Sequence, residues 1–287
     1  MAFDKYSIAG SVILYNSNMQ VIKNIHSYID QINHLFVIDN SEKVNYELVE
    51  KIKMISNITY IYNGSNLGVA YALNQAANMA IRFGYQFLLT MDDDTYFPSD
   101  GIQKMLAYVN QHGIEKLGII ASQCNPQLFD NTVRIVPYTI TSGNLLNLSA
   151  YKECGHFMNE LFIDSVDHEY CFRLKKYGYT ITEINSIQLD HKLGKQKQVK
   201  ILGYRLPIYW GSHNPLRIYY KTRNGIFSIK KYELVSLETK YIFFKEILKD
   251  FFKIIFLENK KKVRLLLFIK GLHDGWKANL GKRTFKM

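Results

Sequence analysis

The first half of the chain alternates short apolar runs with longer amphipathic stretches. Five runs rich in β-branched and aromatic residues predict strands at residues 6–15, 34–39, 58–62, 85–91 and 117–121. Between the third and fourth runs, residues 67–83 carry one helical stripe of apolar side chains, formed by Val69, Leu73, Ala76, Ala77 and Ala80. Strands separated by helices of this length predict right-handed crossovers and a mostly parallel sheet that binds ligands at its carboxyl edge. The predicted fold class is α/β.

Helical periodicity returns in the second half. Val166, Tyr170, Leu174 and Tyr177 mark one predicted helix, and a strand-like stretch at 179–189 follows it. From residue 240 onward, apolar side chains recur at helical spacing: Phe243, Phe244, Ile247, Leu248, Phe251, Ile254 and Ile255. The composition shifts near residue 230. We therefore expect a main domain at 1–230 and a helical extension at 231–287.

Composition excludes several classes of protein. With 287 residues, of which 47% are hydrophobic, the chain can bury a substantial core. Cys124, Cys154 and Cys171 show no CxxC spacing, so the sequence predicts neither a disulfide framework nor a zinc site, and it favours a reducing compartment. The sequence shows neither a secretory leader nor a run of ~18 apolar residues, which predicts a cytoplasmic location.

The net charge of +11 is concentrated at the C-terminal end. Residues 240–287 hold 13 basic and 4 acidic side chains. Lys245, Lys249 and Lys253 lie four residues apart, and a second apolar stretch at 263–269 is flanked by further basic residues. This composition favours an anionic lipid interface. The alternative is a helix pair packed on the core with solvated lysines. No recognised nucleic-acid-binding motif accompanies the charge, so nucleic acid is not expected as a partner.

Three consecutive acids, Asp92, Asp93 and Asp94, follow the fourth predicted strand. Carboxylates packed this closely repel one another unless a cation compensates them. Hard oxygen ligands at the mouth of a sheet suit Mg²⁺ or Mn²⁺ carrying a substrate phosphate. The alternative is an acidic turn followed by a helix cap, because turn and cap residue types come next in the chain.

The loops after the first three predicted strands are also polar. They contain Tyr15 and Asn16, then Asp39 to Ser41, then Asn63 to Gly68 leading into a helix. Parallel topology makes these loops converge, so an acid could bind a base or ribose and backbone N–H groups could bind a phosphate. Each segment also fits an ordinary turn or N-cap. Neither a GxGxxG nor a GxxxxGK[ST] motif is present.

A second acidic cluster starts the helix near residue 166. Asp164 and Asp167 lie three residues apart, and Glu169 precedes Arg173 by four. Capping accounts for part of this cluster, and one acid could act as a general base toward a sugar hydroxyl. His191 ends the following strand-like stretch and could complete a metal shell, although a lone histidine is more often structural.

Seven motifs occur in a set order: VIDNS, NGSNLGVAYALNQA, LLTMDDDT, TSGNLLNLSAY, FIDSVDHEYCFRL, LDHKLG and HNPLRIYYKTRN. Between about Ser11 and Asn224 the chain resembles the bacterial rhamnosyltransferase branch of family 2 glycosyltransferases. The resemblance implies a GT-A fold, a divalent metal and inversion at the anomeric carbon. For this branch it implies dTDP-β-L-rhamnose as the nucleotide-sugar donor.

The resemblance also assigns roles to residues of this sequence. It implies metal contacts for Asp92, Asp94 and His191, with Asp92 also near the ribose, and it implies that Asp167 is the catalytic base, positioned by Glu169 and Arg173. Asp93 replaces the amide usual in this branch and is placed among the donor-binding residues. The remaining assignments are the donor site (Tyr15, Asn16, Asp39, Asn66, Gly68) and the acceptor site (Ser142, Gly143, Asn144, Asp164). In the last motif, His213, Arg217, Arg223 and Asn224 are expected to hold the diphosphate or the acceptor, with diphosphate contacts for the two arginines, and a structural ion-pair role for the arginines is the alternative.

With the basic tail, these assignments predict an enzyme at the inner face of the cell membrane. Its expected acceptor is a polyprenyl-diphosphate-linked glycan of a surface polysaccharide. A galactosyl or galactofuranosyl donor carried by UDP is the nearest alternative. A nucleotidyltransferase or a silent sugar-nucleotide-binding module are alternatives of other classes. The sequence leaves homo-oligomer formation open.

Overall fold

The computed structural model describes residues 7–124, 130–191, 196–201, 204–211, 214–232 and 237–285. For residues 191, 196–201, 204–211, 238, 239 and 242 it describes the backbone alone. The described chain divides into two compact units. The first contains residues up to Asn159 together with Asp167–His191, and the second contains Glu160–Val166 together with the chain from Lys192 onward.

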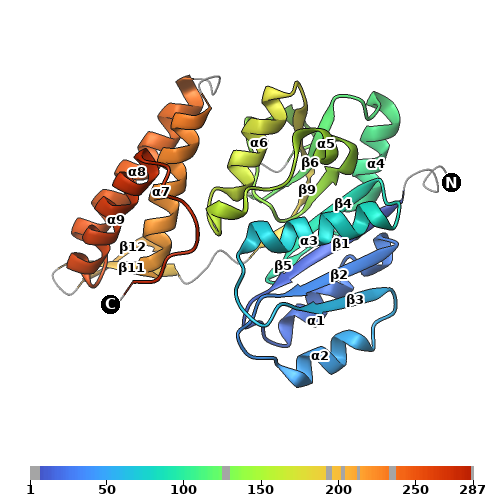
Figure 1. Cartoon of the computed structure of the whole chain (residues 1–287), viewed down its shortest axis with the longest axis horizontal. Helices are drawn as coiled ribbons and strands as arrows, with labels where there is room; N and C mark the ends of the chain where they lie inside the picture. The colour runs from blue at the N-terminus through green and yellow to red at the C-terminus, as the bar shows by residue number, and fades with distance from the viewer. Residues whose placement is uncertain are drawn as a thin grey trace. The chain divides into compact units, whose positions relative to one another are not determined.

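The first unit is built on an eight-stranded sheet with the order β3-β2-β1-β4-β8-β6-β9-β7 (Figure 1). The strands are β1 (Ile8–Leu14), β2 (His34–Asp39), β3 (Ile58–Tyr62), β4 (Phe87–Asp92), β6 (Leu117–Gln123), β7 (Val133–Ile135), β8 (Asn144–Asn147) and β9 (Thr180–Gln188). Strands β3, β2, β1 and β4 are parallel to one another, while β8 is antiparallel to both β4 and β6. The predicted α/β class and the five predicted strands are confirmed.

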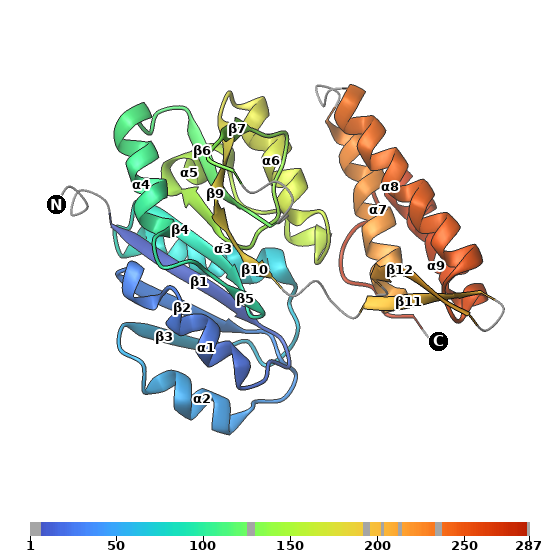
Figure 2. The same ribbon diagram turned by 180° about the vertical axis from the view of Figure 1, so that it is seen from behind.

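Helices cover both faces of this sheet (Figures 1 and 2). On one face, α1 (Gln20–His26), α2 (Tyr46–Lys53) and α4 (Gly101–His112) share an apolar core with the strands. On the other face lie α3 (Val69–Arg82), α5 (Leu148–Cys154) and α6 (Val166–Lys176). Tyr151 of α5 donates to Asn74 Oδ1 of α3 at 2.8 Å, and its ring lies 6.2 Å from Tyr170 of α6. Of the predicted stripe on α3, Leu73, Ala76, Ala77 and Ala80 are buried, and Val69 is partly buried.

The strand register brings the polar strand ends together at one edge. Leu14 of β1 pairs with Asp39 of β2, which pairs with Tyr62 of β3, and Ile13 pairs with Asp92 of β4. All of these strands are parallel, so their carboxyl ends meet there. A short pair, β5 (Thr95–Tyr96) and β10 (Asp190–His191), runs antiparallel beside this edge.

The second unit is mostly helical. It contains the hairpin β11 (Gln196–Ile201) and β12 (Tyr204–Gly211), then α7 (Pro215–Lys231), α8 (Leu237–Phe256) and α9 (Lys261–Trp276). The predicted boundary near residue 230 therefore differs from the observed division, because α7 belongs with the C-terminal helices and with residues 160–166. Within the described part of the chain, no helix is long and apolar enough to cross a membrane.

Two glycines, one helical turn apart, allow α9 to approach α7 closely. A Cβ at Gly271 would lie 2.8 Å from the Tyr219 carbonyl oxygen, and one at Gly275 would overlap the carbonyl oxygen of Arg223. Helix backbones this close leave no room for a methyl group. The Gly271 and Gly275 positions therefore fix the spacing of the α7–α9 pair.

Gly275→Ala is expected to destabilise the protein by about 1–3 kcal/mol, because the added methyl group must push the two helices apart. Urea denaturation followed by circular dichroism measures the effect. Gly225→Ala is the matched control, since its Cβ would meet only Phe243 and Ile247 side-chain atoms at 3.8 and 3.9 Å. Equal stability of both variants would contradict the tight packing.

The three cysteines behave as buried apolar side chains. They are not disulfide-bonded; Cys154 and Cys171 are buried, and Cys124 packs partly against the main core. Burial raises the pKa of Cys154 to about 11 and that of Cys171 to about 12. Thiols with such pKa values are poor nucleophiles.

Candidate active site

The aspartate triplet forms the turn between β4 and β5. Asp92 is half-buried and Asp94 is exposed. The Asp92 backbone N–H donates to Ser142 Oγ at 3.0 Å, and that hydroxyl donates to Thr95 Oγ1 at 3.0 Å. Ser142 thus contacts residues on both sides of the turn. The two outer carboxylates lie at the carboxyl edge of the sheet.

The middle carboxylate, Asp93, contacts the loop after β1. It accepts a hydrogen bond from Ser17 Oγ, and its backbone oxygen accepts one from Asn24 Nδ2 at 2.8 Å. Ser17 Oγ in turn accepts the backbone N–H of Tyr15 at 3.1 Å. Burial and the charges of its two neighbours raise the pKa of Asp93, while the Ser17 hydrogen bond opposes the shift. Its carboxylate ties the Tyr15 loop to the triplet.

The loops after β1, β2 and β3 are hydrogen-bonded to one another. The Asn16 backbone N–H donates to Ser41 Oγ at 2.8 Å, and Tyr15 Oη donates to Glu42 at 3.2 Å. Asn40 Nδ2 donates to the Gly68 carbonyl oxygen at 3.1 Å. The three polar loops that the sequence places at one edge therefore meet there.

Asp39 is 4% exposed, at the end of β2. Its Oδ2 accepts the Tyr60 hydroxyl at 2.7 Å, and its Oδ1 accepts the Ser41 backbone N–H at 2.9 Å. Burial and this hydrogen bond raise the pKa of Tyr60, which keeps the phenol protonated as a donor. Both oxygens of Asp39 thus already have a protein partner, and a base or ribose would share them.

The start of α3 offers free backbone donors. Gly68 precedes the helix with φ of 92°, a conformation that favours glycine, and its N–H donates to Asn66 Oδ1 at 3.0 Å. No side chain caps the first turn of α3. A helix N-terminus without a side-chain cap suits a phosphate group, as the sequence predicts for this segment.

The residues present fit a divalent cation. The β5–β10 register pairs His191 with Thr95, the residue after Asp94, so the backbone brings the third predicted ligand beside the triplet. The His191 side chain lies outside the described part of the structure, and the described side chains alone form no cluster of three metal ligands. Two carboxylates and an imidazole are a donor set that Mg²⁺ or Mn²⁺ accepts.

Asp167 lies in the first turn of α6 and is half-buried. Its Oδ1 accepts the backbone N–H of His168 at 2.9 Å. Asp167 borders a void of about 10 Å³, no larger than one water molecule, together with Thr90, Asn144 and apolar side chains such as Leu146 and Phe157. Asn144 follows Ser142 and Gly143, and Thr90 precedes Asp92 on β4. The structure thus brings the predicted base beside the predicted acceptor residues.

Gly143 packs so closely against its neighbours that a side chain would not fit there. Its φ is 73°, and a Cβ there would lie 2.6 Å from both Leu189 Cδ1 and Ser122 Oγ. Its N–H donates to the Thr90 carbonyl oxygen at 2.8 Å. A glycine is needed at this position, and it holds residues 141–144 against β4.

Glu169 and Arg173 form the predicted pair on α6. Arg173 Nη2 lies 2.8 Å from Glu169 Oε2, and Glu169 is fully buried. Arg173 Nη1 also donates to the carbonyl oxygen of His156 at 2.6 Å. The pair therefore orients α6 relative to the end of α5, and through α6 it orients Asp167.

The backbone of residues 160–164 is held by α7 within the second unit. Asn224 Nδ2 donates to the carbonyl oxygens of Leu161, Ile163 and Asp164 at 2.9, 2.7 and 2.8 Å. Phe162, Asp164 and Ser165 have φ values of 66°, 62° and 59°, a region that non-glycine residues rarely occupy. Strain of this kind persists only where neighbouring groups impose it.

The position of Arg223 does not support the diphosphate contact that the sequence predicts for it. It is 0% exposed. Its Nη2 donates to Glu160 O and Leu161 O at 3.2 and 3.1 Å, and its Nη1 donates to Gly281 O at 2.6 Å. Because these carbonyl groups occupy the guanidinium, Arg223 holds the backbone and cannot reach a ligand.

Arg217, six residues before Arg223 on α7, forms an ion pair with Asp164. Arg217 Nη2 lies 2.6 Å from Asp164 Oδ1, and its Nε donates to Oδ2 at 3.3 Å. The Arg217 side chain is 45% exposed, so it remains accessible to a ligand. The predicted acceptor contact of Asp164 and the diphosphate contact of Arg217 stay predictions, and His213 lies outside the described residues.

Sequence reasoning missed Ser17 and Tyr60, and it placed Asn224 at the diphosphate or acceptor and not at the backbone of residues 161–164. Ser17 and Asp93 are 76 residues apart, and Tyr60 and Asp39 are 21 apart. Ser17 does follow a predicted strand end within the loop that contains Tyr15 and Asn16. That location was the available signal, because strand-end loops of a parallel sheet share one edge.

Comparison with known proteins decides the family. The sequence model "Glycosyl transferase family 2" matches residues 11–159, more than half of the chain. The chain belongs to this family. The dTDP-rhamnosyl transferase RfbF of Shigella flexneri is 27% identical over 248 residues, which covers 78% of this chain and 80% of that protein. The resemblance to the rhamnosyltransferase branch is thereby confirmed, and this family 2 protein is a glycosyltransferase.

Solved structures confirm the GT-A fold. S. aureus TarS matches with a TM-score of 0.62 at 16% identity, over 95% of this chain and 49% of that chain. TarS 1–349 in complex with UDP-GlcNAc matches with a TM-score of 0.62 at 14% identity, over 95% and 81%. GalNAc-T7 with UDP, GalNAc and Mn²⁺ matches with a TM-score of 0.58 at 14% identity, over 96% and 56%. This glycosyltransferase spans about half the length of the first and last of these chains.

Proposed function

We propose that this glycosyltransferase moves L-rhamnose from dTDP-β-L-rhamnose to a hydroxyl group of a lipid-linked glycan, with inversion at the anomeric carbon. The position of Asp167 carries the proposal. It lies in the first turn of α6, close to Thr90, two residues before Asp92, and close to Asn144, one of the predicted acceptor residues. The name of the S. flexneri relative supports the donor.

In the proposed reaction, Asp167 accepts the proton of the acceptor hydroxyl. That oxygen attacks C1 of the sugar, the bond from C1 to the diphosphate oxygen breaks, and dTDP leaves with the electron pair. The Asp167 carboxylate has one oxygen held by the His168 N–H, and no described residue donates to the other. An aligned, accessible carboxylate of this kind is suited to general base catalysis.

Donor binding is proposed for the strand-end loops. The uncapped start of α3 would bind the diphosphate, and Asp39 would bind the nucleoside, with Tyr15 and Asn16 beside it. Asp92, Asp94 and His191 would hold a Mg²⁺ or Mn²⁺ ion, which supplies positive charge to the leaving diphosphate. Asp93 would act indirectly, by fixing the Tyr15 loop.

A panel of nucleotide sugars tests the donor. We expect dTDP-β-L-rhamnose to be turned over at least about tenfold faster than UDP-galactose or UDP-galactofuranose, and product NMR to show an α-linked rhamnose. Preference for a UDP-galactosyl donor would contradict the assignment. Each donor is assayed with Mg²⁺, with Mn²⁺ and with excess EDTA, and full activity in EDTA would contradict the metal dependence.

An exposed apolar stripe on α8 supports membrane association. Phe243 and Ile254 are buried against the other helices, but another face of the same helix is exposed. That face carries Leu237, Tyr241, Phe244, Leu248, Phe252 and Phe256, with exposed fractions of 43–84%. Exposed Lys245 and Lys249 lie among these residues. Apolar side chains ringed by lysines fit an anionic lipid surface, where the proposed acceptor would be found.

Vesicle flotation tests this surface. Replacing Phe252 and Phe256 together with Ser is expected to weaken binding to vesicles containing phosphatidylglycerol by at least about tenfold, because each phenylalanine contributes roughly 1.5–3 kcal/mol when buried. Tyr46→Ser is the matched control, since Tyr46 is an aromatic residue of the first unit that is 77% exposed. Unchanged flotation of the double variant would show that the exposed face of α8 is not the membrane-binding surface.

A further inference from the structure

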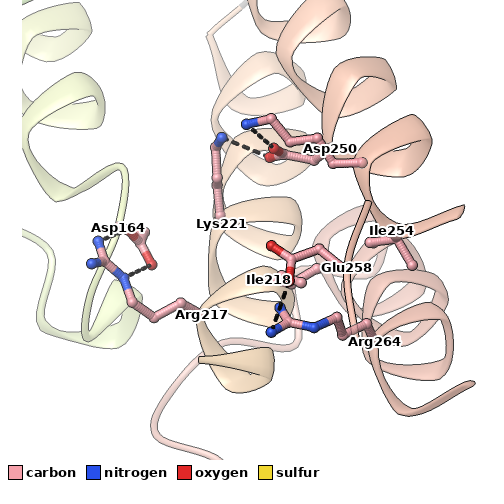
Figure 3. A pocket seen from close by; sticks show the side chains of 9 residues that line it. Asp164, Arg217, Ile218, Lys221, Asp250, Ile254, Glu258 and Arg264 are labelled. Atoms are coloured by element: carbon pink, nitrogen blue, oxygen red, sulfur yellow. Dashed lines mark hydrogen bonds and ion pairs between the residues drawn. The ribbon is translucent and has the colours of Figure 1, made fainter. Parts of the chain in front are cut away.

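The helical unit contains a cavity that the proposed reaction does not use. Its volume is about 160 Å³, well above the roughly 10–15 Å³ that one water molecule needs. Its wall is formed by residues of α7, α8, the α8–α9 connection, α9 and the 160–166 segment: Asp164, Arg217, Ile218, Lys221, Asp250, Lys253, Ile254, Glu258 and Arg264. Figure 3 shows their charged ends gathered around the space between the helices.

The cavity wall contains four cationic side chains and three carboxylates. Lys221 Nζ lies 2.6 Å from Asp250, and Lys253 lies 3.7 Å from the same carboxylate. Arg217 contacts Asp164, as described above. Lys221 also lies 3.7 Å from Glu246, a carboxylate outside the wall, so the one additional positive charge of the wall has this acid near it.

Arg264 is the distinctive member of this wall. Its side chain is 7% exposed, its Nε donates to the Asn259 carbonyl oxygen at 2.9 Å, and its Nη2 lies 3.3 Å from Glu258. Its Nη1 is buried and has no hydrogen-bond partner. A buried guanidinium nitrogen without an acceptor is costly, because it has lost its hydration without gaining a hydrogen bond.

The surrounding groups suit an anion as the missing acceptor. Arg264 lies in the first turn of α9, where the helix dipole adds positive potential, and no side chain caps that helix. Lys221 and Arg217 have side chains that are 41% and 45% exposed, so they can turn toward a ligand. Arginine and lysine together are the usual partners of phosphate oxygens.

We propose that this cavity binds a phosphate-type dianion, with Arg264 Nη1 as its central donor and Lys221 and Arg217 at its mouth. The dianion could be the terminal phosphate of a lipid headgroup or a free phosphate or diphosphate. The site is formed within the helical unit alone. It does not depend on the identity of the sugar donor.

Binding of inorganic phosphate and of diphosphate to the full chain tests the site by isothermal titration calorimetry. Wild type is expected to bind diphosphate, and the dissociation constant should rise at least about tenfold in Arg264→Gln and in Lys221→Gln, a loss of about 1.4 kcal/mol. Lys277→Gln is the matched control, because Lys277 is exposed and lies outside the cavity wall. Circular dichroism checks folding, and if Arg264→Gln is unfolded, Lys221→Gln alone decides.

Binding to lipid vesicles distinguishes a lipid headgroup from a free phosphate or diphosphate as the ligand. Vesicles with phosphatidic acid, a phosphomonoester, are compared with phosphatidylglycerol vesicles of equal surface charge. If the wild type prefers phosphatidic acid and Lys221→Gln loses this preference, the ligand is a lipid headgroup. Binding of free diphosphate without this preference would identify a soluble ligand. Absence of phosphate and diphosphate binding in wild type, or equal affinity in wild type and both cavity variants, would overturn the proposal and leave the cluster as ion pairs that hold the helices together.

Discussion

Asp167→Asn is expected to lower the turnover number by about 10²–10⁴-fold, the range that a positioned general base contributes. The amide keeps an oxygen that can accept the His168 N–H, so the start of α6 should be preserved. It cannot accept the proton of the acceptor hydroxyl. Donor affinity should therefore change by less than about twofold, since the lost contact acts in the transition state.

Single-turnover kinetics and calorimetric titration of the donor measure these two quantities separately. Asp100→Asn is the matched control, because Asp100 is paired with Lys104 on the surface and lies outside the proposed site. A parallel loss of donor affinity and turnover in Asp167→Asn would contradict the assignment. It would indicate that Asp167 shapes the donor site instead.

Arg223→Ala is expected to lower the free energy of unfolding by about 3–5 kcal/mol. The change removes a large, fully buried side chain and leaves the carbonyl oxygens of Glu160, Leu161 and Gly281 without this donor. Arg223→Lys should recover only part of the loss, because one ammonium group cannot reproduce the planar fork.

Urea denaturation measures the stability of both variants. Lys277→Ala is the control, and as an exposed substitution it should stay within about 0.5 kcal/mol of wild type. A loss below about 1 kcal/mol in Arg223→Ala would show that the buried carbonyl groups find other donors.

The sheet and its polar edge were predictable because their signals are local. Each strand of the first half is a short apolar run. Residues 40 and 41 directly follow the strand that ends at Asp39, and residues 63–68 directly follow the strand that ends at Tyr62. Parallel topology then brings these loops together without further information, and the observed hydrogen bonds of Asn40 with Gly68 and of Asn16 with Ser41 agree. The Glu169–Arg173 pair was likewise predictable from its spacing of four residues.

The partners of Asp93 and Arg223 were not predictable in the same way. Asp93 contacts Ser17 at a distance of 76 residues along the chain, and Arg223 contacts Glu160 at a distance of 63. Neither periodicity nor composition reports contacts between side chains so far apart. The same reason explains why the two compact units do not divide near residue 230. A change in composition marks the basic helices, whereas the compact units depend on what α7 packs against.

The strained segment before Asp167 has a consequence for how the protein is made. The carbonyl groups of this segment accept hydrogen bonds from side chains of α7. The Gly281 N–H donates to the Glu160 carbonyl oxygen, and the Gly281 carbonyl oxygen accepts from Arg223 of α7. A ribosome adding 5–20 residues per second reaches residue 281 roughly 6–24 s after residue 160. The backbone of residues 160–164 therefore reaches its final conformation only after residue 281 has been synthesised. A nascent chain that already carries the donor-binding loops is expected to lack this ordered segment during that interval.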